Sequence, residues 1–461
     1  MNDLWRRLTR IRQVLRFQAF ELDSAEGRAL ERERRMAWTT LSSLGARFVA
    51  IGVQFFVVGL LIRSLGKVRY GVWATLVSTV GWLNIVQLGV APSLLNALSA
   101  DPDADAEAMV STAYWIQIGF AFCLALLFVP LFFVIPWGSV VNTEDTGISL
   151  EAGAAAMVLL VLFLFRLPLS ITTTVYKSYQ EGYIASAWTV LGSLTVLGAV
   201  AYTVRDAPVL SAVAGATQGW PVLALAFATI LLLGRSRVHL RPRWSVVDRA
   251  VGKRLVRVGI HFTIAGIAGA ILVGTDNIVI AQILGPEAVT PYAVTFLLTQ
   301  VVITMVMLIL DASWPAWSEA AGRGDVDWLR RSYRNVFRLT MGALFVVGGG
   351  LLLVGQPLIR WWAGAEAVPS TALLSALVLL SIVQGLFLCT GRLITALGAV
   401  HVTAGVGVAN AVINLTVSIA LGHYIGVAGV ALGTVIGYVA SGWVLFPIAR
   451  RELARVEGEG T

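Results

Sequence analysis

The sequence contains few charged residues and few cysteines. Asp, Glu, Lys and Arg together make up 13% of the 461 residues, whereas a soluble domain usually carries about 25%. The two cysteines, Cys123 and Cys389, both fall in apolar stretches. They are expected to be buried thiols, and nothing in their placement indicates a disulfide framework or a metal site.

Two further absences limit the function. The chain lacks the Gly-Lys-Ser/Thr loop that binds nucleotide phosphates, so we do not expect it to be an ATP-driven pump by itself. No segment between apolar stretches exceeds about 25 residues, which leaves no room for a soluble catalytic domain of ordinary size. We therefore expect a protein that is not an enzyme and that needs no cofactor.

Long hydrophobic stretches dominate the chain. Hydrophobic residues make up 57% of the sequence, and the mean hydropathy is +0.80. Stretches of about 20 residues recur, each long enough for a helix to cross a hydrocarbon core of about 30 Å. A transmembrane barrel would instead show strands of about ten residues with alternating polarity. The pattern predicts an all-α polytopic membrane protein with spans at 37–62, 72–97, 110–135, 153–176, 184–204, 208–233, 258–283, 288–315, 335–356, 370–391, 402–423 and 426–449.

The basic residues are distributed asymmetrically between the predicted loops. With both termini on the cytoplasmic side, 27 of the 34 Lys and Arg residues lie in inner segments or, for Arg338, at the inner end of a predicted span, and five lie in outer loops. Because cytoplasmic loops carry an excess of Lys and Arg, this distribution predicts a multi-pass membrane protein with twelve spans and both termini in the cytoplasm. It also accounts for the net charge of +8, so nucleic acid is not expected as a partner.

The spans form two sets of six. Residues 1–36 precede them, with Leu4, Leu8, Ile11 and Leu15 at helical spacing among arginines. This pattern suits a basic amphipathic helix on the inner leaflet, and a disordered basic tail is the equal alternative. The predicted parts are this cytoplasmic segment, an N-terminal six-helix bundle at 37–233, a basic linker at 234–257, a C-terminal bundle at 258–449 and a cytoplasmic tail at 450–461.

A short internal repeat supports this division. Leu65-Gly66 follows the first predicted span and precedes Tyr70, and Leu284-Gly285 follows the seventh and precedes Tyr292. An even number of spans separates the copies, so both halves have the same orientation in the membrane. We therefore expect a pseudo-twofold axis along the membrane normal.

Charged residues inside the predicted spans are the main candidates for function, because such charges are costly and usually face a cavity or a partner. Arg47 and Arg166 lie near mid-depth in spans 1 and 4, where arginine can bind two oxygens of a phosphate. The alternative is a structural or gating ion pair between Arg47 and Asp276 or another carboxylate. Asp276 is a candidate coupling or gate residue, and so is Asp311, which lies nearer the membrane surface.

Uncharged polar residues in the spans extend this candidate site. Amides in spans 1, 2 and 8 are predicted to contribute to substrate binding, although amides inside membranes more often form hydrogen bonds between helices. The candidates are Gln54, Asn84, Gln87 and Gln300.

Three stretches resemble a known family. They are residues 65–71 (LGKVRYG), residues 274–285 (GTDNIVIAQILG), and residues 412–415 (VINL) with 424–432 (YIGVAGVAL). They are similar to polysaccharide repeat-unit (Wzx-type) flippases of the multidrug/oligosaccharidyl-lipid/polysaccharide (MOP) flippase superfamily. The resemblance implies a MATE-like pair of six-helix bundles around a cleft that spans 1, 2, 7 and 8 line.

The same resemblance implies a function. It implies a transporter that flips an undecaprenyl-pyrophosphate-linked oligosaccharide from the inner to the outer leaflet by alternating access, for exopolysaccharide, capsule or O-antigen synthesis. An H⁺ or Na⁺ gradient would drive transport, and a polysaccharide polymerase and glycosyltransferases would be protein partners. The alternatives are a drug/cation antiporter of the same superfamily and a non-transporting scaffold for polysaccharide synthesis.

Overall fold

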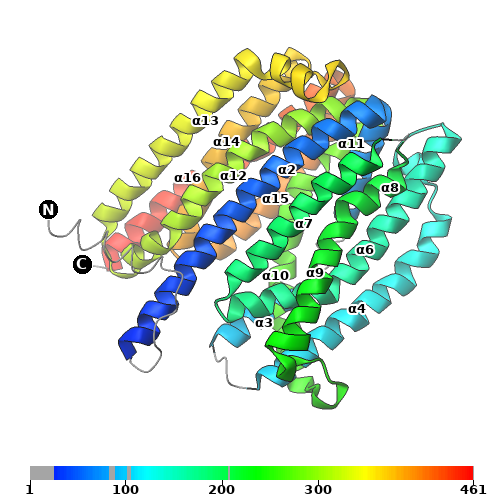
Figure 1. Cartoon of the computed structure of the whole chain (residues 1–461). Coiled ribbons are helices and arrows are strands. Elements are labelled where there is room, and N and C mark those ends of the chain that lie inside the picture. The colour runs from blue at the N-terminus through cyan, green and yellow to red at the C-terminus, as the bar shows by residue number, and fades with distance from the viewer. Residues whose placement is uncertain (1–24, 82–88, 101–104, 206–207, 460–461) are drawn as a thin grey trace. The chain divides into compact units, whose positions relative to one another are not determined.

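The computed structural model describes residues 25–81, 89–100, 105–205 and 208–459, and every regular element in these ranges is a helix (Figure 1). Short π-helical turns cover Gly215–Gly219 and Leu232–Ser236, and single 3-10 turns cover Val238–Leu240, Trp244–Val246 and Ala365–Ala367. The α-helices are α2 (Ala25–Gly81), α3 (Val90–Ala100), α4 (Ala106–Val134), α5 (Trp137–Val140), α6 (Thr146–Ser178), α7 (Gly182–Thr203), α8 (Leu210–Ala214), α9 (Trp220–Leu231), α10 (Arg249–Gly274), α11 (Asp276–Leu284), α12 (Pro286–Gly322), α13 (Val326–Ala363), α14 (Thr371–Ala396), α15 (Val400–Ile425) and α16 (Val427–Glu459).

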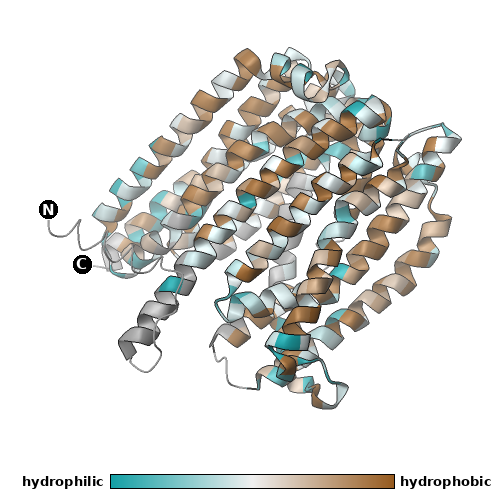
Figure 2. Ribbon diagram, in the orientation of Figure 1, coloured by the Kyte–Doolittle hydropathy of each residue, from teal (hydrophilic) through white to brown (hydrophobic). Residues whose placement is uncertain are grey.

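Ten helices in the described part of the chain are long and apolar enough to cross a membrane. Hydrophobic residues cover most of their length in Figure 2. The predicted all-α polytopic membrane fold is confirmed. Two features explain why the structure has ten such helices in its described part although the sequence predicts twelve spans. The Trp38–Gly81 stretch contains the first predicted span and the start of the second, and the seventh predicted span is divided between α10 and α11.

Gly66 and Gly285 break the helical path at equivalent places in the internal repeat. Gly66 has φ 73° and ψ 175° inside α2, and Gly285 has φ 86° and ψ 163° between α11 and α12. Residues with a Cβ rarely adopt a positive φ, so glycine is favoured at both turns. Tyr70 and Tyr292, which follow these glycines, are both buried. The Leu-Gly…Tyr pattern therefore has the same local structure in both copies.

The segment predicted as a linker is partly helical. α10 begins at Arg249, where the Asp248 carboxylate accepts a hydrogen bond from the Ala250 backbone N–H at 2.6 Å. Earlier in the segment, Arg237 forms an ion pair with Glu181 at 2.9 Å and lies over the ring of Tyr179 at 3.7 Å. These contacts tie the segment to the turn between α6 and α7.

The chain groups into two compact units whose residues interleave along the sequence. The first unit contains residues 1–57, 87–135 and 155–263, and the second contains 58–86, 136–154 and 264–461. The predicted bundle boundaries remain a prediction. Each unit has its own apolar core: Val90, Leu94, Val110, Ile171 and Leu232 in the first, and Leu310, Trp317, Leu329, Cys389 and Leu393 in the second.

The two cysteines differ in their surroundings. Cys389 is buried in the core of the second unit, as predicted, whereas Cys123 is exposed on α4. The prediction of a buried thiol at Cys123 is therefore wrong. An apolar stretch that crosses a membrane has one side facing lipid, and hydrophobicity alone does not distinguish that side from the protein interior.

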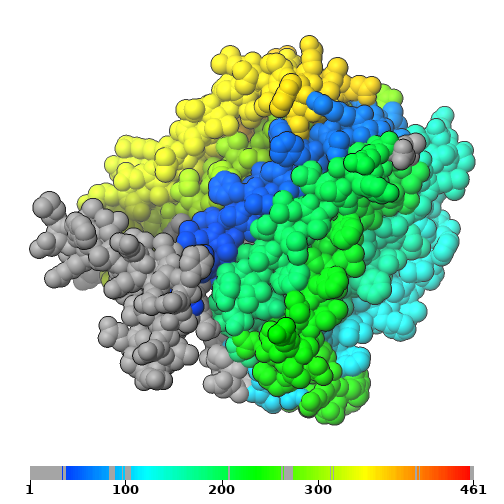
Figure 3. Space-filling view, viewed as in Figure 1, coloured from blue at the N-terminus to red at the C-terminus, as the bar shows by residue number. Residues whose placement is uncertain are grey.

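Large apolar side chains point outward on α13. Phe345, Val346 and Leu353 are 61%, 75% and 83% exposed. α13 (yellow) lies at the surface of the face that Figure 3 shows. An exposed apolar surface of this kind is typical of a helix in contact with lipid.

α15 and α16 pack closely along a row of small residues. Gly429, Gly433 and Gly437 recur every four residues on α16. A Cβ at Gly433 would lie 2.4 Å from Ser418 Oγ, and one at Gly437 would lie 2.5 Å from Asn410 Oδ1. Small residues at this spacing let membrane helices approach each other closely. The row brings the polar residues of α15 against α16.

Candidate functional site

A buried carboxylate lies at the start of α11 in the second unit. Asp276 is 4% exposed, and its Oδ2 accepts hydrogen bonds from the hydroxyl of Tyr292 on α12 and, at 3.0 Å, from the hydroxyl of Thr434 on α16. The ring of Tyr292 stacks on Phe296, with 5.7 Å between centroids. Three helices thus hold one carboxylate oxygen in a fixed position.

Of the buried polar atoms that have no hydrogen-bond partner within the described structure, four belong to Asp276, Asn410 and Asn414. They are the second oxygen of Asp276 (Oδ1), both side-chain amide atoms of Asn410, and Nδ2 of Asn414. Asn410 and Asn414 lie on α15, which packs against both α11 and α16. Buried polar atoms normally have partners, and unpaired ones indicate a site for water, a proton or an ion. We define Asp276, Tyr292, Thr434, Asn410 and Asn414 as the Asp276 cluster.

The Asp276 cluster does not have the composition of a tight metal site. Within the described residues, no group of three or more His, Cys, Asp or Glu side chains is placed to hold a metal ion. One carboxylate with hydroxyl and amide neighbours suits a proton or a weakly held hard cation with oxygen ligands.

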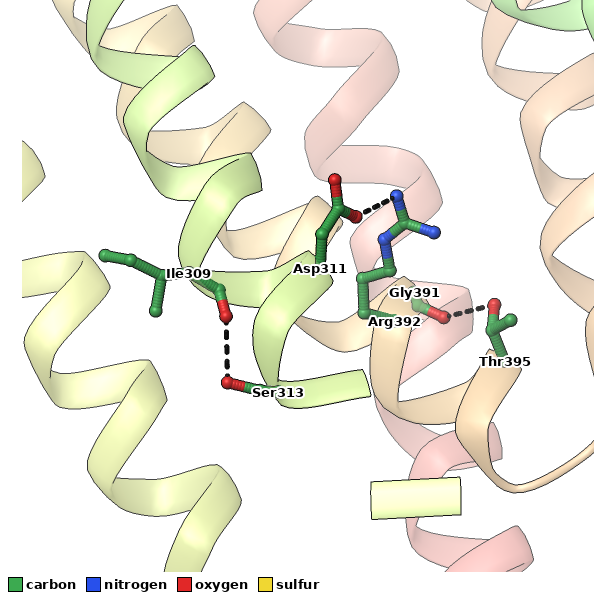
Figure 4. Close-up of polar contacts among 6 residues, drawn as sticks. All are labelled: Ile309, Asp311, Ser313, Gly391, Arg392 and Thr395. Carbon is green, nitrogen blue, oxygen red and sulfur yellow. Dashed lines mark hydrogen bonds and ion pairs between the residues drawn. The ribbon is translucent and has the colours of Figure 1, made fainter. Parts of the chain in front are cut away.

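Asp311 forms an ion pair within the second unit. Its Oδ1 lies 2.8 Å from Nη2 of Arg392 on α14, as Figure 4 shows. The guanidinium group also lies 5.2 Å from the centre of the Trp314 ring. The side chains of Asp311 and Arg392 are 45% and 25% exposed, so the pair is partly accessible. Asp311 and Asp276 therefore occupy different environments, although the sequence assigns them the same role.

Gln300 contacts a neighbouring helix. Its Nε2 donates a hydrogen bond to Oε1 of Gln384 on α14 at 3.1 Å. The contact is a hydrogen bond between helices, which is the alternative to substrate binding that the sequence analysis gives for these amides.

Three candidate residues of the first unit are exposed. Arg47 and Gln54 lie on α2, seven residues or about two turns apart, and Arg166 lies on α6 two residues before Pro168. All three side chains are accessible. Asn84 and Gln87 lie outside the described residues. The assignment of these residues to substrate binding stays a prediction.

A second polar network connects sequence-distant loops within the second unit. Arg69 forms an ion pair with Glu151, and Arg63 donates a hydrogen bond to the backbone carbonyl of Trp361. The backbone N–H of Lys67 donates to Glu366 at 3.1 Å. These contacts join the turn at Gly66 to the start of α6, to the end of α13 and to the 3-10 turn Ala365–Ala367.

The same turn packs against the start of α12. The hydroxyl of Thr290 donates a hydrogen bond to the carbonyl of Lys67 at 2.6 Å. A Cβ at Gly71 would lie 1.8 Å from the carbonyl oxygen of Pro286, so only glycine fits there.

A third set of contacts links the segment 136–145, between α4 and α6, to the end of α11. Asn142 donates to the carbonyl of Ala281 at 3.0 Å, and Gln282 donates to the carbonyl of Ser139, also at 3.0 Å. We call the contacts that the Gly66 turn and the segment 136–145 make with residues 281–290, 361 and 366 the latch.

Sequence reasoning missed both the latch and most of the Asp276 cluster. Arg63, Lys67 and Arg69 are three of the five basic residues that the charge count places in outer loops, and Thr434 lies in an apolar stretch. A helix-period pattern shows which residues share one helix face, but it does not show which helices meet.

Comparison with known proteins decides the family. A sequence profile described as "Polysaccharide biosynthesis protein" matches residues 37–321. The chain belongs to this family. Its resemblance to Wzx-type MOP flippases, seen in the sequence, is confirmed. A curated relative from Salmonella typhi, named "Putative O-antigen transporter", is 26% identical over 328 residues, which cover 68% of this chain and 71% of the relative.

Solved structures confirm the family's fold. An inward-facing multidrug resistance MATE family transporter of the MOP superfamily has a TM-score of 0.71 at 15% identity, covering 98% of this chain and 99% of its own. The lipid II flippase MurJ, in an inward closed conformation, has a TM-score of 0.72 at 13% identity, covering 91% of this chain and 90% of its own. These similarities show that the chain has the MOP transporter fold.

Proposed function

We propose that this protein flips a lipid-linked oligosaccharide repeat unit from the inner to the outer leaflet of a membrane. The observation that carries the proposal is the family match over residues 37–321 in a chain with the MOP transporter fold. The relative named as an O-antigen transporter supports a polysaccharide precursor as the cargo. We propose an undecaprenyl-pyrophosphate carrier, and exopolysaccharide, capsule or O-antigen as the product.

Arg47, Gln54 and Arg166 are proposed to bind the headgroup of the substrate. Their exposure in the first unit supports this role, because a pyrophosphate in a membrane requires accessible cations. Arginine suits it best, since its guanidinium stays charged and can bond two phosphate oxygens at once. Asn84, Gln87 and Gln300 are proposed as further polar contacts.

Asp276 is proposed as the coupling residue. Its unpaired Oδ1 supports reversible binding of H⁺ or Na⁺, because a buried carboxylate gains stability from either cation. The two hydrogen bonds on Oδ2 hold the group in place as the cation enters or leaves. Asp311, paired with Arg392, is proposed as part of a gate.

The latch is proposed as the element that opens and closes during alternating access. It joins residues of the first predicted bundle to residues of the second through hydrogen bonds and the close contact at Gly71. Polar contacts that exchange with water can break at a modest free-energy cost. The loops involved are predicted to lie on the outer side of the membrane.

The protein is proposed to lie in the bacterial inner membrane with both termini in the cytoplasm. The excess of Lys and Arg in the predicted inner loops supports this orientation. A polysaccharide polymerase and glycosyltransferases, which would consume and supply the substrate, are proposed as protein partners.

A deletion strain tests the proposed function. Deleting the gene should cause lipid-linked oligosaccharide to accumulate and surface polysaccharide to disappear, and wild-type protein should reverse both effects. Arg47→Ala should restore little surface polysaccharide. Arg47→Lys should restore part of it, because lysine keeps the charge but cannot bond two phosphate oxygens at once as arginine does. Unchanged surface polysaccharide in the deletion strain would refute the proposal. Drug-efflux assays with Asp276→Asn would then test the antiporter alternative.

A further inference from the structure

An apolar groove runs between α14 and α16 in the second unit. Its volume is about 590 Å³, within the usual range for ligand sites. On the α14 side, Val383, Leu386, Phe387 and Thr390 recur at helical spacing and line one wall. The opposite wall is formed by α16 through Tyr438, Val439, Gly442, Trp443, Phe446, Pro447 and Arg450.

The groove is open because one of the residues that line it, Gly442, has no side chain. Gly442 lies between the bulky side chains of Tyr438 and Phe446, and a Cβ built there would meet nothing within 4 Å. The rings of Phe387 and Tyr438 meet edge to face at 5.2 Å. The hydroxyl of Thr390 donates to the carbonyl of Leu386 at 3.0 Å. With that hydroxyl already bonded inside its own helix, the groove suits a hydrocarbon chain better than a sugar.

One end of the groove is basic. Arg450 belongs to its lining, and its side chain is exposed. A smaller neighbouring pocket, of about 290 Å³, shares Phe446 with the groove and is lined by Arg330 and Arg334 of α13. Apolar walls therefore lead to a cluster of arginines at the end of the groove.

We propose that this groove binds one acyl chain of an anionic glycerophospholipid and that Arg450 binds its phosphate. Basic pockets between transmembrane helices recognise anionic lipid headgroups in this way. Trp443, 78% exposed on the rim, is an aromatic residue of the kind that lies at a membrane interface. The N-terminal segment 1–36 is a poorer occupant, because its nine arginines would face further arginines. None of the residues that line the groove is among the proposed substrate contacts.

Lipid binding to the purified full-length chain tests whether Arg450 binds the lipid phosphate. In nanodiscs of phosphatidylcholine with a small fraction of phosphatidylglycerol, wild-type protein should retain phosphatidylglycerol in native mass spectra. Arg450→Gln should weaken this retention about fivefold. The neighbouring Arg451→Gln, which is outside the groove, should leave it unchanged. Equal losses in both variants would mean that only general surface charge attracts the lipid, and would overturn the assignment.

Filling the groove with a large side chain tests whether the groove binds the acyl chain. Gly442→Phe should occupy the open space and abolish photocrosslinking of phosphatidylglycerol with a diazirine in its acyl chain. Gly350→Phe, at a helical glycine of α13 that also has nothing within 4 Å, should crosslink like the wild type. Persistent crosslinking at α14 and α16 in Gly442→Phe would contradict the proposal.

Two competing occupants give different results. If polyisoprenyl phosphate displaces phosphatidylglycerol at equimolar concentration, the groove belongs to the transported carrier and the phospholipid assignment fails. If wild-type crosslinks connect the groove to residues 1–36 rather than to lipid, the assignment also fails. Neither readout measures transport, so the outcome is independent of the proposed flippase function.

Discussion

At Asp276 the two oxygens of one carboxylate have different surroundings. Oδ2 accepts bonds from Tyr292 and Thr434, while Oδ1 is buried with no partner among the described residues. A side chain that served only to join helices would be expected to have both oxygens paired. The unpaired oxygen is therefore the feature that a coupling cation would use.

Replacing Asp276 by asparagine should abolish the response of transport to an ion gradient. The amide keeps the shape of the side chain but neither binds a proton at neutral pH nor attracts a cation. We expect gradient-driven flipping by Asp276→Asn to fall about tenfold or more, measured in proteoliposomes with imposed H⁺ or Na⁺ gradients. Asp327→Asn, at an exposed carboxylate in the first turn of α13, is the matched control. Gradient-dependent transport by Asp276→Asn would exclude the coupling role.

Tyr292→Phe should destabilise the protein without removing the carboxylate. It deletes a buried hydrogen bond to a charged group, which contributes about 1.5–3 kcal/mol. A lower melting temperature of the detergent-solubilised variant is the expected result. Tyr202→Phe, at a tyrosine that is 75% exposed, should melt like the wild type. Equal melting temperatures for all three proteins would mean that the Tyr292 bond contributes nothing.

At the scale of helices, the row of glycines on α16 determines how closely α15 can approach. Substituting alanine in a helix usually stabilises it by about 1 kcal/mol relative to glycine. At Gly433 the added methyl would lie 2.4–2.5 Å from three atoms of Ser418, two of them backbone, so the helices must separate. Such overpacking costs about 1–3 kcal/mol.

Gly433→Ala should therefore lower the stability of the fold, whereas Gly405→Ala should preserve or raise it. Gly405 lies on α15, and a Cβ there meets nothing within 4 Å. The ratio of folded to aggregated protein after heating, measured by size-exclusion chromatography, distinguishes the two variants. A Gly433→Ala protein as heat-resistant as Gly405→Ala would show that α15 and α16 do not pack this closely.

The latch provides a test at the same scale. In a background without Cys123 and Cys389, Asn142→Cys with Gln282→Cys places two thiols where side chains now bridge the segment 136–145 and α11. Oxidation should stop transport, and reduction should restore it, if the contact opens in every cycle. Each single-cysteine variant should transport normally under both conditions. Undiminished transport by the fully oxidised pair would mean that the latch stays closed throughout the cycle.

For the molecule as a whole, the sequence predicts the class of fold because a bilayer requires long apolar helices, and such stretches are visible without a structure. The sequence also places the two copies of the Leu-Gly repeat after the first and seventh predicted spans, and Gly66 and Gly285 in these copies share a positive φ. The residues around Asp276 are harder to predict. Thr434 is 158 residues from Asp276 and meets it only because α11 and α16 pack together. Glu151 likewise becomes a partner of Arg69 only in the folded chain.

The central claim concerns movement of lipid between leaflets, so the most direct measurement is flipping by the purified protein. Proteoliposomes would contain lipid-linked oligosaccharide in the inner leaflet, and a membrane-impermeant glycosidase outside would cleave each oligosaccharide as it emerges. With an H⁺ or Na⁺ gradient, we predict cleavage that exceeds that of protein-free liposomes and that falls in both Arg47→Ala and Asp276→Asn. Cleavage no faster than in protein-free liposomes under either gradient would contradict the account.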